Sequence, residues 1–450
     1  MAQLEVTFYD GTGKTYINPN AGEEDGTAAV TADCNCGDDR TVNVRVASDK
    51  GGLSKQVAIN QVGVREQFIP ADQTEGMKGA DGDYFLGIKA EYADNLPDGC
   101  IPLPEHIHID QTQTDPAKMI TGDVRGKTIT AIKEGSNCFV MKPEGDSWGL
   151  YRLSKTSRTQ YADGTDASAD IKQYDVMMRL PEFWYRGTEG DQVDIYFETT
   201  QPSDPENWVH WDGNVLIGCY KSNYDSINGL KSISGVDIST NISHANFKAY
   251  AEARGTGFQL VDWEMHCVMA VLFYAWYGNT NAQTVFDTGF MIKDEITGTT
   301  DSLGMTDGIA GNGNLKSVNF WGLEDWWLGY YEFMYDTTTT ETGILVYNPN
   351  IKEFDRDVEL NYRGVGYKFV SKMKFGKYLD CIATEVNGDE NSGYCDPQAW
   401  GRNSGYPTRR SGYSTGAPPY SGLAYLETQS EAVEAVGSRL CYRGPFIIHN

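Results

Sequence analysis

The feature that most constrains this chain is a run of thirteen mostly apolar residues, MHCVMAVLFYAWY, from Met265 to Tyr277. A helix that crosses a bilayer needs about 20 such residues, so this run is too short to do so. Asp262 can cap a helix that begins at Trp263, and Gly278 can end it. Because such a helix is apolar on nearly every side, it must be covered on both sides. We therefore predict the central core helix of a globular domain.

A second helix is predicted immediately before this one. Ser243 can cap the segment HANFKAYAEAR, Arg254 falls in its last turn, and Gly255 follows as the residue that ends it. The segment VDIYF, from Val193 to Phe197, instead alternates apolar and other residues as a half-buried strand does. The C-terminal part of the chain is therefore expected to mix helices with strands.

The N-terminal part is predicted to contain only short strands. In TVNVRVAS, Val42, Val44 and Val46 share one face, and in QVAIN, Val57 and Ile59 do so. The glycines of the intervening SDKGG segment suit a hairpin turn, and GTGKT at Gly11 is also expected to be a turn. This pattern favours a small β-sandwich.

Length and local pattern predict three domains. A chain of 450 residues is long enough for two to four domains, since each typically takes about 100 to 200 residues. We place the first at residues 1–64 and a β-rich connecting domain at 65–168, where prolines separate strand-like runs such as KTITAI. The third domain then spans residues 169–450. The expected fold class is β-rich and multidomain.

The first domain resembles the BACON domain, an immunoglobulin-like module. The resemblance lies in an acidic turn before RTVNVRV, a glycine-rich turn, and KQVAINQVG followed by REQF. It covers about 60 residues, and it implies an immunoglobulin-like β-sandwich.

The third domain resembles the C-type-lectin-like domain of phage fibre and receptor-binding proteins, a fold shared with formylglycine-generating-enzyme-type domains. The resemblance is carried by several strings in order, and it implies an α+β domain. These strings are VMMRLPEFWYR, LIGCYKS, the segment from Ala245 to Phe286 that contains GFQLVDWE, SVNFWGLEDWWLGYYEFMYD, and VGSRLCYRGPF.

One of those strings holds a dense cluster of aromatic residues. Rings of this size bury about 150 to 250 Å² each, so we expect most of them to pack in the core. They are Trp321, Trp326, Trp327, Tyr330, Tyr331 and Phe333.

Recognition is expected instead in the segments between the scaffold strings, because loops on a rigid frame carry binding residues. The longest such insert runs from Cys381 to Ser430, and its Gly, Ser, Asn, Tyr and Arg content is typical of a paratope. An ordinary structured loop is the alternative, and residues 287–313 form a candidate neighbour. The predicted ligand-binding residues are Tyr394, Trp400, Arg402, Asn403, Tyr406, Tyr413 and Tyr420.

The net charge of −26 and the N-terminus restrict the partners. An acidic chain of this kind repels a phosphate backbone, so nucleic acid is not expected as a partner. MAQLEVTFYD resembles no export signal, which favours assembly in the host cytoplasm. We therefore expect an attachment protein on a phage virion that binds host-surface glycan or protein and contacts other virion proteins. A homo-oligomer, most simply a trimer, would add avidity, and a purely structural virion protein or a bacterial surface adhesin is the alternative.

Other chemical signals are weaker, and neither a cofactor nor a resident metal is predicted. His106 and His108 share one face of a strand but are only two possible ligands, and NGDEN at Asn387 lacks a calcium-site spacing. Nine cysteines at irregular spacings favour free thiols, including Cys34 and Cys36. No enzyme is expected, because Cys381, Cys395 and Cys441 supply no matching pair and no carboxylate pair can be assigned to glycan cleavage.

Overall fold

The computed structural model describes most of the chain from residue 104 onward, together with seven short strands before it. The chain divides into two compact units, Met1–Glu105 and His106–Asn450. The described ranges are 104–286, 296–312, 315–341, 343–348, 353–359, 364–400, 407–410, 422–424, 426–428, 432 and 434–449.

The described part of the first unit consists of strands. β5 pairs antiparallel with β4, and Val44 lies opposite Val57, which confirms the predicted hairpin. The predicted boundary at residue 64, residues 11–14 of the GTGKT segment, Cys34 and Cys36 lie outside the described residues. The strands are β1 (Leu4–Thr7), β2 (Thr15–Ile17), β3 (Val30–Ala32), β4 (Arg40–Ala47), β5 (Ser54–Gln61), β6 (Ile69–Pro70) and β7 (Cys100–Ile101).

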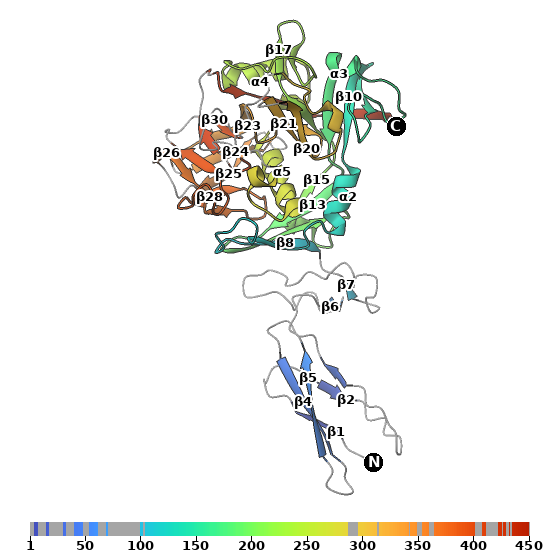
Figure 1. The fold of residues 1–450 in the computed structure, drawn as a ribbon, viewed down its shortest axis with the longest axis vertical. Helices are drawn as coiled ribbons and strands as arrows, with labels where there is room; N and C mark the ends of the chain where they lie inside the picture. The colour runs from blue at the N-terminus through green and yellow to red at the C-terminus, as the bar shows by residue number, and fades with distance from the viewer. Residues whose placement is uncertain are drawn as a thin grey trace. The chain divides into compact units, whose positions relative to one another are not determined.

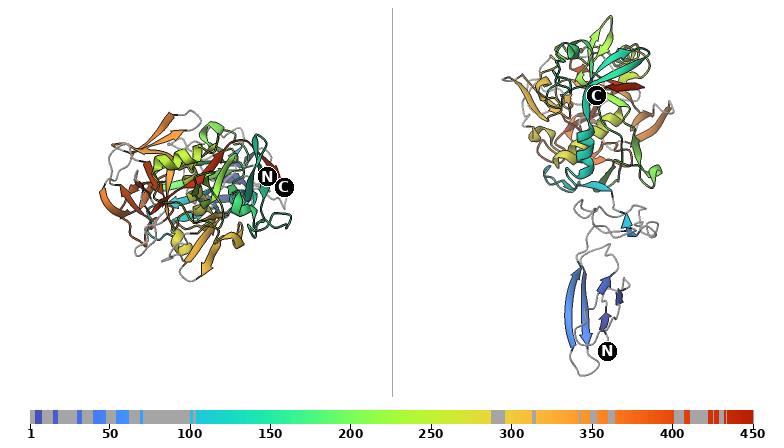
Figure 2. Two further views of the ribbon diagram at one scale, coloured as in Figure 1. Left: turned by 90° about the horizontal axis from the view of Figure 1, so that it is seen from above. Right: turned by 90° about the vertical axis from the view of Figure 1, so that its right-hand side faces the viewer.

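A seven-stranded sheet in the second unit contains strands from its beginning and from its end. β34 pairs in parallel with β11, so the last described strand lies beside one of the early ones (Figure 2). β33 lies between β19 and β16. In sheet order the strands are β19 (Phe258–Leu260), β33 (Arg439–Arg443), β16 (Val215–Lys221), β12 (Asp175–Arg179), β10 (Asn137–Glu144), β11 (Ser147–Arg152) and β34 (Phe446–His449).

This sheet shows that the predicted domain boundary near residue 169 is wrong. β10 pairs with β12, and Val140 lies opposite Val176. Residues from both sides of the proposed boundary therefore share backbone hydrogen bonds and one core. The prediction failed because the pairing joins segments that are distant in sequence, and their local pattern does not reveal it.

A five-stranded sheet has one face in the core and one face outside it. On its central strand, β14, Val193, Ile195 and Phe197 are buried, as the alternation predicted. In sheet order the strands are β15 (Val209–Trp211), β13 (Phe183–Gly187), β14 (Gln192–Glu198), β8 (Glu105–Asp110) and β9 (Ile120–Gly122).

An eight-stranded sheet contains the strands that frame the insert at residues 381–430. Its order is β25 (Glu353–Glu359), β24 (Gly343–Asn348), β23 (Tyr331–Thr339), β30 (Pro407–Arg410), β31 (Leu426–Thr428), β29 (Pro397–Trp400) and β26 (Gly364–Phe369), and β32 (Val436–Gly437) also pairs with β23. Smaller sheets contain β17 (Asn223–Asp225), β18 (Gly229–Lys231), β20 (Gly308–Asn312), β21 (Leu315–Phe320), β22 (Leu323–Glu324), β27 (Lys372–Lys374) and β28 (Ile382–Glu385).

The predicted core helix is present with the predicted ends. α5 spans Trp263–Tyr277 and lies within the second unit (Figure 1). The Asp262 side chain accepts a hydrogen bond from the backbone nitrogen of Met265, and Gly278 ends the helix with φ of 61°. Burial around the whole circumference confirms that this helix is covered on both sides. No helix among the described residues has the length and hydropathy of a membrane-spanning segment.

The other helices are shorter. In α4 (His244–Glu252), Ser243 provides the predicted cap by accepting from the backbone nitrogen of Asn246. KTITAI, which was predicted to be strand-like, is instead the start of α2 (Lys127–Gly135). Ile129 and Ile132 are three residues apart and both buried, so core contacts outweigh the strand preference of β-branched residues. The remaining helical segments are α3 (Asp170–Gln173), η2 (Pro205–Asn207), α6 (Ala282–Val285) and η3 (Asp301–Leu303).

Candidate functional site

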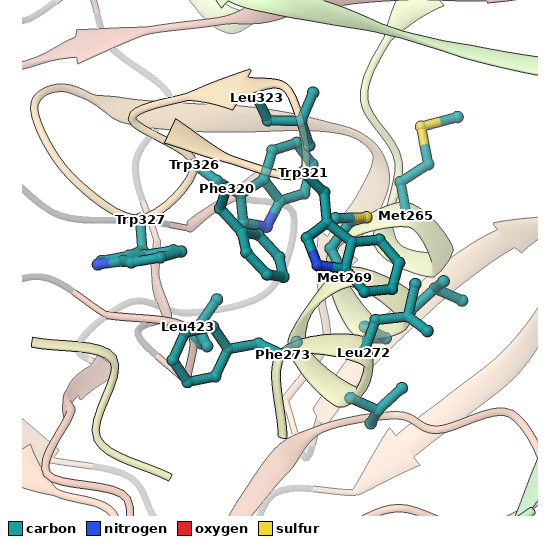
Figure 3. Packing of buried hydrophobic residues seen from close by; sticks show 14 of the residues in the cluster. Met265, Met269, Leu272, Phe273, Phe320, Trp321, Leu323, Trp326, Trp327 and Leu423 are labelled. Carbon is teal, nitrogen blue, oxygen red and sulfur yellow. The ribbon is translucent and has the colours of Figure 1, made fainter. Parts of the chain in front are cut away.

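The predicted aromatic cluster is part of the core. Trp321 is fully buried, Trp326 and Trp327 are each 1 % exposed, and Figure 3 shows them facing residues of α5. The ring of Trp327 lies edge-on to that of Phe273, with 5.3 Å between centroids. Tyr330, Tyr331 and Phe333 are also buried, so the packing prediction for this cluster is confirmed.

A set of ionic residues is sealed in the same core. Lys221 Nζ lies 2.6 Å from Glu332 Oε1, and Arg439 Nη2 lies 2.9 Å from the same oxygen. Burial by itself would raise the pKa of Glu332, but the charges of Arg439 and Lys221 outweigh that effect and lower it to about 2. Since all three side chains are buried, this group is not accessible to a ligand.

Gln111 joins the beginning of the predicted recognition insert to the strand that precedes it, β27. Gln111 Nε2 donates to the carbonyl of Met373, and Gln111 Oε1 accepts from the backbone nitrogen of Met373. Tyr394 donates its hydroxyl to the same Gln111 oxygen at 2.9 Å and is fully buried. The prediction that Tyr394 contacts a ligand is therefore corrected. Its ring and hydroxyl are both used inside the fold.

Asp396 holds two parts of the insert together. Its Oδ2 accepts from the backbone nitrogen of Ala424 at 2.8 Å. Burial raises the pKa of this carboxyl well above its usual value, although backbone donors oppose the shift. A Cβ at Gly422 would lie 1.6 Å from Asp396 Oδ1, so only glycine allows this close approach. The two sides of the insert are thus fixed next to each other.

Strand pairing also holds the two sides of the insert, β29 and β31, next to each other. β29 pairs in parallel with β31, and Gln398 lies opposite Leu426. Trp400 is the last residue of β29 and lies opposite Gly364 in β26. The side chain of Trp400 and the predicted residues Arg402, Asn403, Tyr406, Tyr413 and Tyr420 lie outside what the structure describes, as do residues 287–295 and 313 of the candidate neighbouring loop. The insert is therefore attached to the eight-stranded sheet at three strands, β29, β30 and β31, since β30 (Pro407–Arg410) pairs with β23 and with β31.

A second candidate surface is the outer face of the five-stranded sheet. In β8, Ile107 and Ile109 are fully buried, whereas the His106 and His108 side chains are each 15 % exposed. The two histidines therefore share the outer face, as predicted. Within the described ranges, no group of three or more His, Cys, Asp and Glu side chains is arranged to hold a metal ion.

Both ring nitrogens of His108 have close polar neighbours on the outer face of the five-stranded sheet. Its Nδ1 lies 2.7 Å from Asp194 Oδ1, and its Nε2 lies 2.7 Å from Gln192 Oε1. The Gln192 amide nitrogen donates to Asp110, which fixes the amide orientation. Hydrogen bonds, led by that of the Thr112 hydroxyl, hold the pKa of Asp110 below its usual value. Both ring nitrogens of His108 are therefore in contact with side chains of β14 in the same sheet.

The cysteine residues within the described ranges are buried and free. Burial raises the pKa of Cys395 to about 12 and that of Cys441 well above its usual value. A reactive cysteine needs an accessible thiolate, and these environments disfavour it. The predicted absence of a disulfide framework holds for Cys138, Cys219, Cys267, Cys381, Cys395 and Cys441.

Arg186, Trp184 and His210 are outer-face residues that the sequence reasoning did not select. In β13, FWYRG alternates buried and partly exposed side chains, so Trp184 and Arg186 point away from the core. The alternation of this strand was the signal in the sequence that could have identified them.

No model of a known protein family matches this chain, and no curated protein matches its sequence. Its function must therefore be inferred from side-chain geometry and from the sequence patterns described above.

Proposed function

We propose that this chain is an attachment protein of a phage virion that binds glycan or protein on the host surface through its C-terminal unit. The observation that carries the proposal is the insert from Cys381 to Ser430, which is anchored in the eight-stranded sheet through β29, β30 and β31. Its sequence is rich in Gly, Ser, Tyr and Arg. Small polar residues and rings on a fixed frame are the usual composition of a protein-binding or sugar-binding surface.

The lectin-like and immunoglobulin-like architectures belong to this proposal. Two features of the second unit support the lectin-like part. The string GFQLVDWE leads into α5, and the string VGSRLCYRG forms β32 and β33, with β33 inside the seven-stranded sheet. Both strings are therefore scaffold, which leaves recognition to the segments between them. A homotrimer would multiply weak individual sites.

The test is retention of the fluorescently labelled full chain on a panel of bacterial cells. We expect saturable binding to cells of a susceptible strain. Trp400→Ala and Tyr406→Ala should each weaken it about tenfold or more without unfolding the unit, since truncation of a binding hot spot costs about 2 kcal/mol. Tyr378→Ala is the matched control, because Tyr378 is 45 % exposed but lies outside the insert.

The alternatives give different results in the same experiments. A purely structural virion protein would be found on particles by immunogold labelling but would bind none of the cells. A bacterial surface adhesin would be labelled on cells that carry no phage. Wild-type binding by folded Trp400→Ala and Tyr406→Ala variants would exclude these two residues from the recognition surface.

A further inference from the structure

The guanidinium of Arg186 is held between two aromatic rings on the outer face of the five-stranded sheet. Its central carbon lies 4.7 Å from the ring centroid of Tyr196 and 4.8 Å from that of Trp208. Arg186 in β13 lies directly opposite Tyr196 in β14. Both rings are almost fully buried, so the plane of the guanidinium is fixed and only its N–H edge remains for hydrogen bonding.

This guanidinium has no anionic partner in the part of the chain that the structure describes. Its Nε is buried without a hydrogen-bond partner, and no ion pair or hydrogen bond connects its other nitrogens to a described residue. Two carboxylates near Arg186, those of Asp204 and Asp194, have other partners. Asp204 accepts from Trp208 Nε1 at 3.0 Å, and Asp194 contacts His108. An unpaired, ring-clamped arginine is unexpected in a chain with 63 acidic and 37 basic residues.

An aromatic stack lies next to Arg186 on the same face. Trp184 is two positions away along β13, which corresponds to about 7 Å, and it points to the same side. Its ring stacks on His210 of β15 with 4.3 Å between centroids, and His210 Nε2 lies 2.8 Å from Glu182 Oε1. Trp184 is partly exposed and His210 is exposed, so the stack offers an apolar surface to a flat ligand.

We propose that this face binds a carboxylate-bearing sugar, with Arg186 as the group that binds the carboxylate and the Trp184–His210 stack as the support for the sugar ring. A planar guanidinium binds a carboxylate through two parallel hydrogen bonds. A uronic acid residue offers both groups at once, because its carboxylate and its ring are directly joined. An acidic peptide of Asp or Glu has the charge but no ring to pack against the stack.

The proposal is tested with soluble trigalacturonate and the full chain, by calorimetric titration. We expect saturable binding that becomes about tenfold weaker or more when the carboxylates are methyl-esterified, because each charge-assisted hydrogen bond is worth about a factor of ten or more. Arg186→Met should lose binding to the same extent, because it keeps an apolar side chain between the rings without the charge. Arg152→Met is the matched control, since it removes the same charge from the seven-stranded sheet.

Three results would overturn the proposal. They are absence of trigalacturonate binding by the wild type, equal binding of the methyl ester, and unchanged binding by folded Arg186→Met. Triglutamate that binds as tightly as trigalacturonate would also overturn it, because the site would then respond to charge alone. If Arg186→Met does not fold, Arg186→Lys keeps the charge without the two-pronged geometry and should still weaken binding. No cells are involved, so failure here leaves the attachment proposal standing, and failure of cell binding leaves this site standing.

Discussion

Two arginines of the second unit, Arg439 and Arg186, lie in opposite environments. Arg439 is fully buried and pairs with Glu332, while its Nη1 and Nη2 donate to the carbonyls of Gly218, Cys219 and Glu324. Arg186 lies on a sheet face between two rings and has no partner of this kind among the described residues. Arg439 finds all of its partners within the fold, so its charge serves the structure. Arg186 is oriented by two rings but has no such partner, so its N–H groups can bind a ligand.

The most direct test of this difference is to remove the buried arginine, Arg439. Arg439→Met should destabilise the unit by about 3 to 5 kcal/mol, because it leaves the buried Glu332 with less compensation and three carbonyls without a donor. Urea denaturation of the two proteins measures the difference. A loss of less than about 1 kcal/mol would mean that the buried cation is dispensable.

The aromatic cluster gives a second comparison, between a buried ring and a ring of the insert. Trp326→Ala should cost about 3 to 5 kcal/mol, because it opens a cavity in a closely packed core. Trp400→Ala should leave the melting temperature nearly unchanged if its ring serves recognition. Thermal melting of both variants measures this. A melting temperature that falls equally in both would place Trp400 in the core.

Acid should weaken the buried ionic group. The pKa of Glu332 is about 2 in the fold, against a usual value of 4.5, so its stabilisation is complete above pH 4.5. It is lost as the pH falls from 4.5 toward 2, by about 3 kcal/mol in total. Denaturation curves between pH 6 and 2 measure this loss. Glu332→Gln should lack this part of the pH dependence, and an identical dependence in the variant would assign it to other groups.

The smallest effect on stability is expected on the sheet face. Arg186→Met should change the free energy of unfolding by no more than about 1 kcal/mol, since it removes two cation–π contacts but no ion pair. Urea denaturation beside Arg439→Met provides the direct contrast. If both substitutions destabilise the unit equally, Arg186 is a scaffold residue like Arg439.

Local features of the fold were predictable from the sequence, and long-range features were not. Asp262, Gly278 and the apolar run between them determine α5 through neighbouring residues alone, so both of its ends were predicted correctly. The pairing of β10 with β12 joins distant segments, and the boundary near residue 169 was therefore misplaced. KTITAI was misread because tertiary contacts of two isoleucines outweigh their intrinsic preference.

The candidate sites show the same division. That His106 and His108 share a face follows from the twofold period of a strand. Tyr394 was placed among ligand-binding residues because its neighbours are small and polar, but Gln111, nearly 300 positions earlier, takes its hydroxyl. The missing partner of Arg186 could not be predicted either, because it depends on every segment that folds around that residue.

The position of β33 has a consequence for synthesis of the chain on the ribosome. β33 (Arg439–Arg443) lies between β19 and β16, and β34 then pairs with β11. Until residues 439–443 emerge, the facing edges of β16 (Val215–Lys221) and β19 (Phe258–Leu260) have no partner strand, although both strands are made long before β33 (Arg439–Arg443). During synthesis the second unit therefore has strand edges with unpaired N–H and C=O groups, and such edges are prone to pair with other chains. Translation that stops before Arg439 would release an aggregation-prone intermediate instead of a shorter working protein.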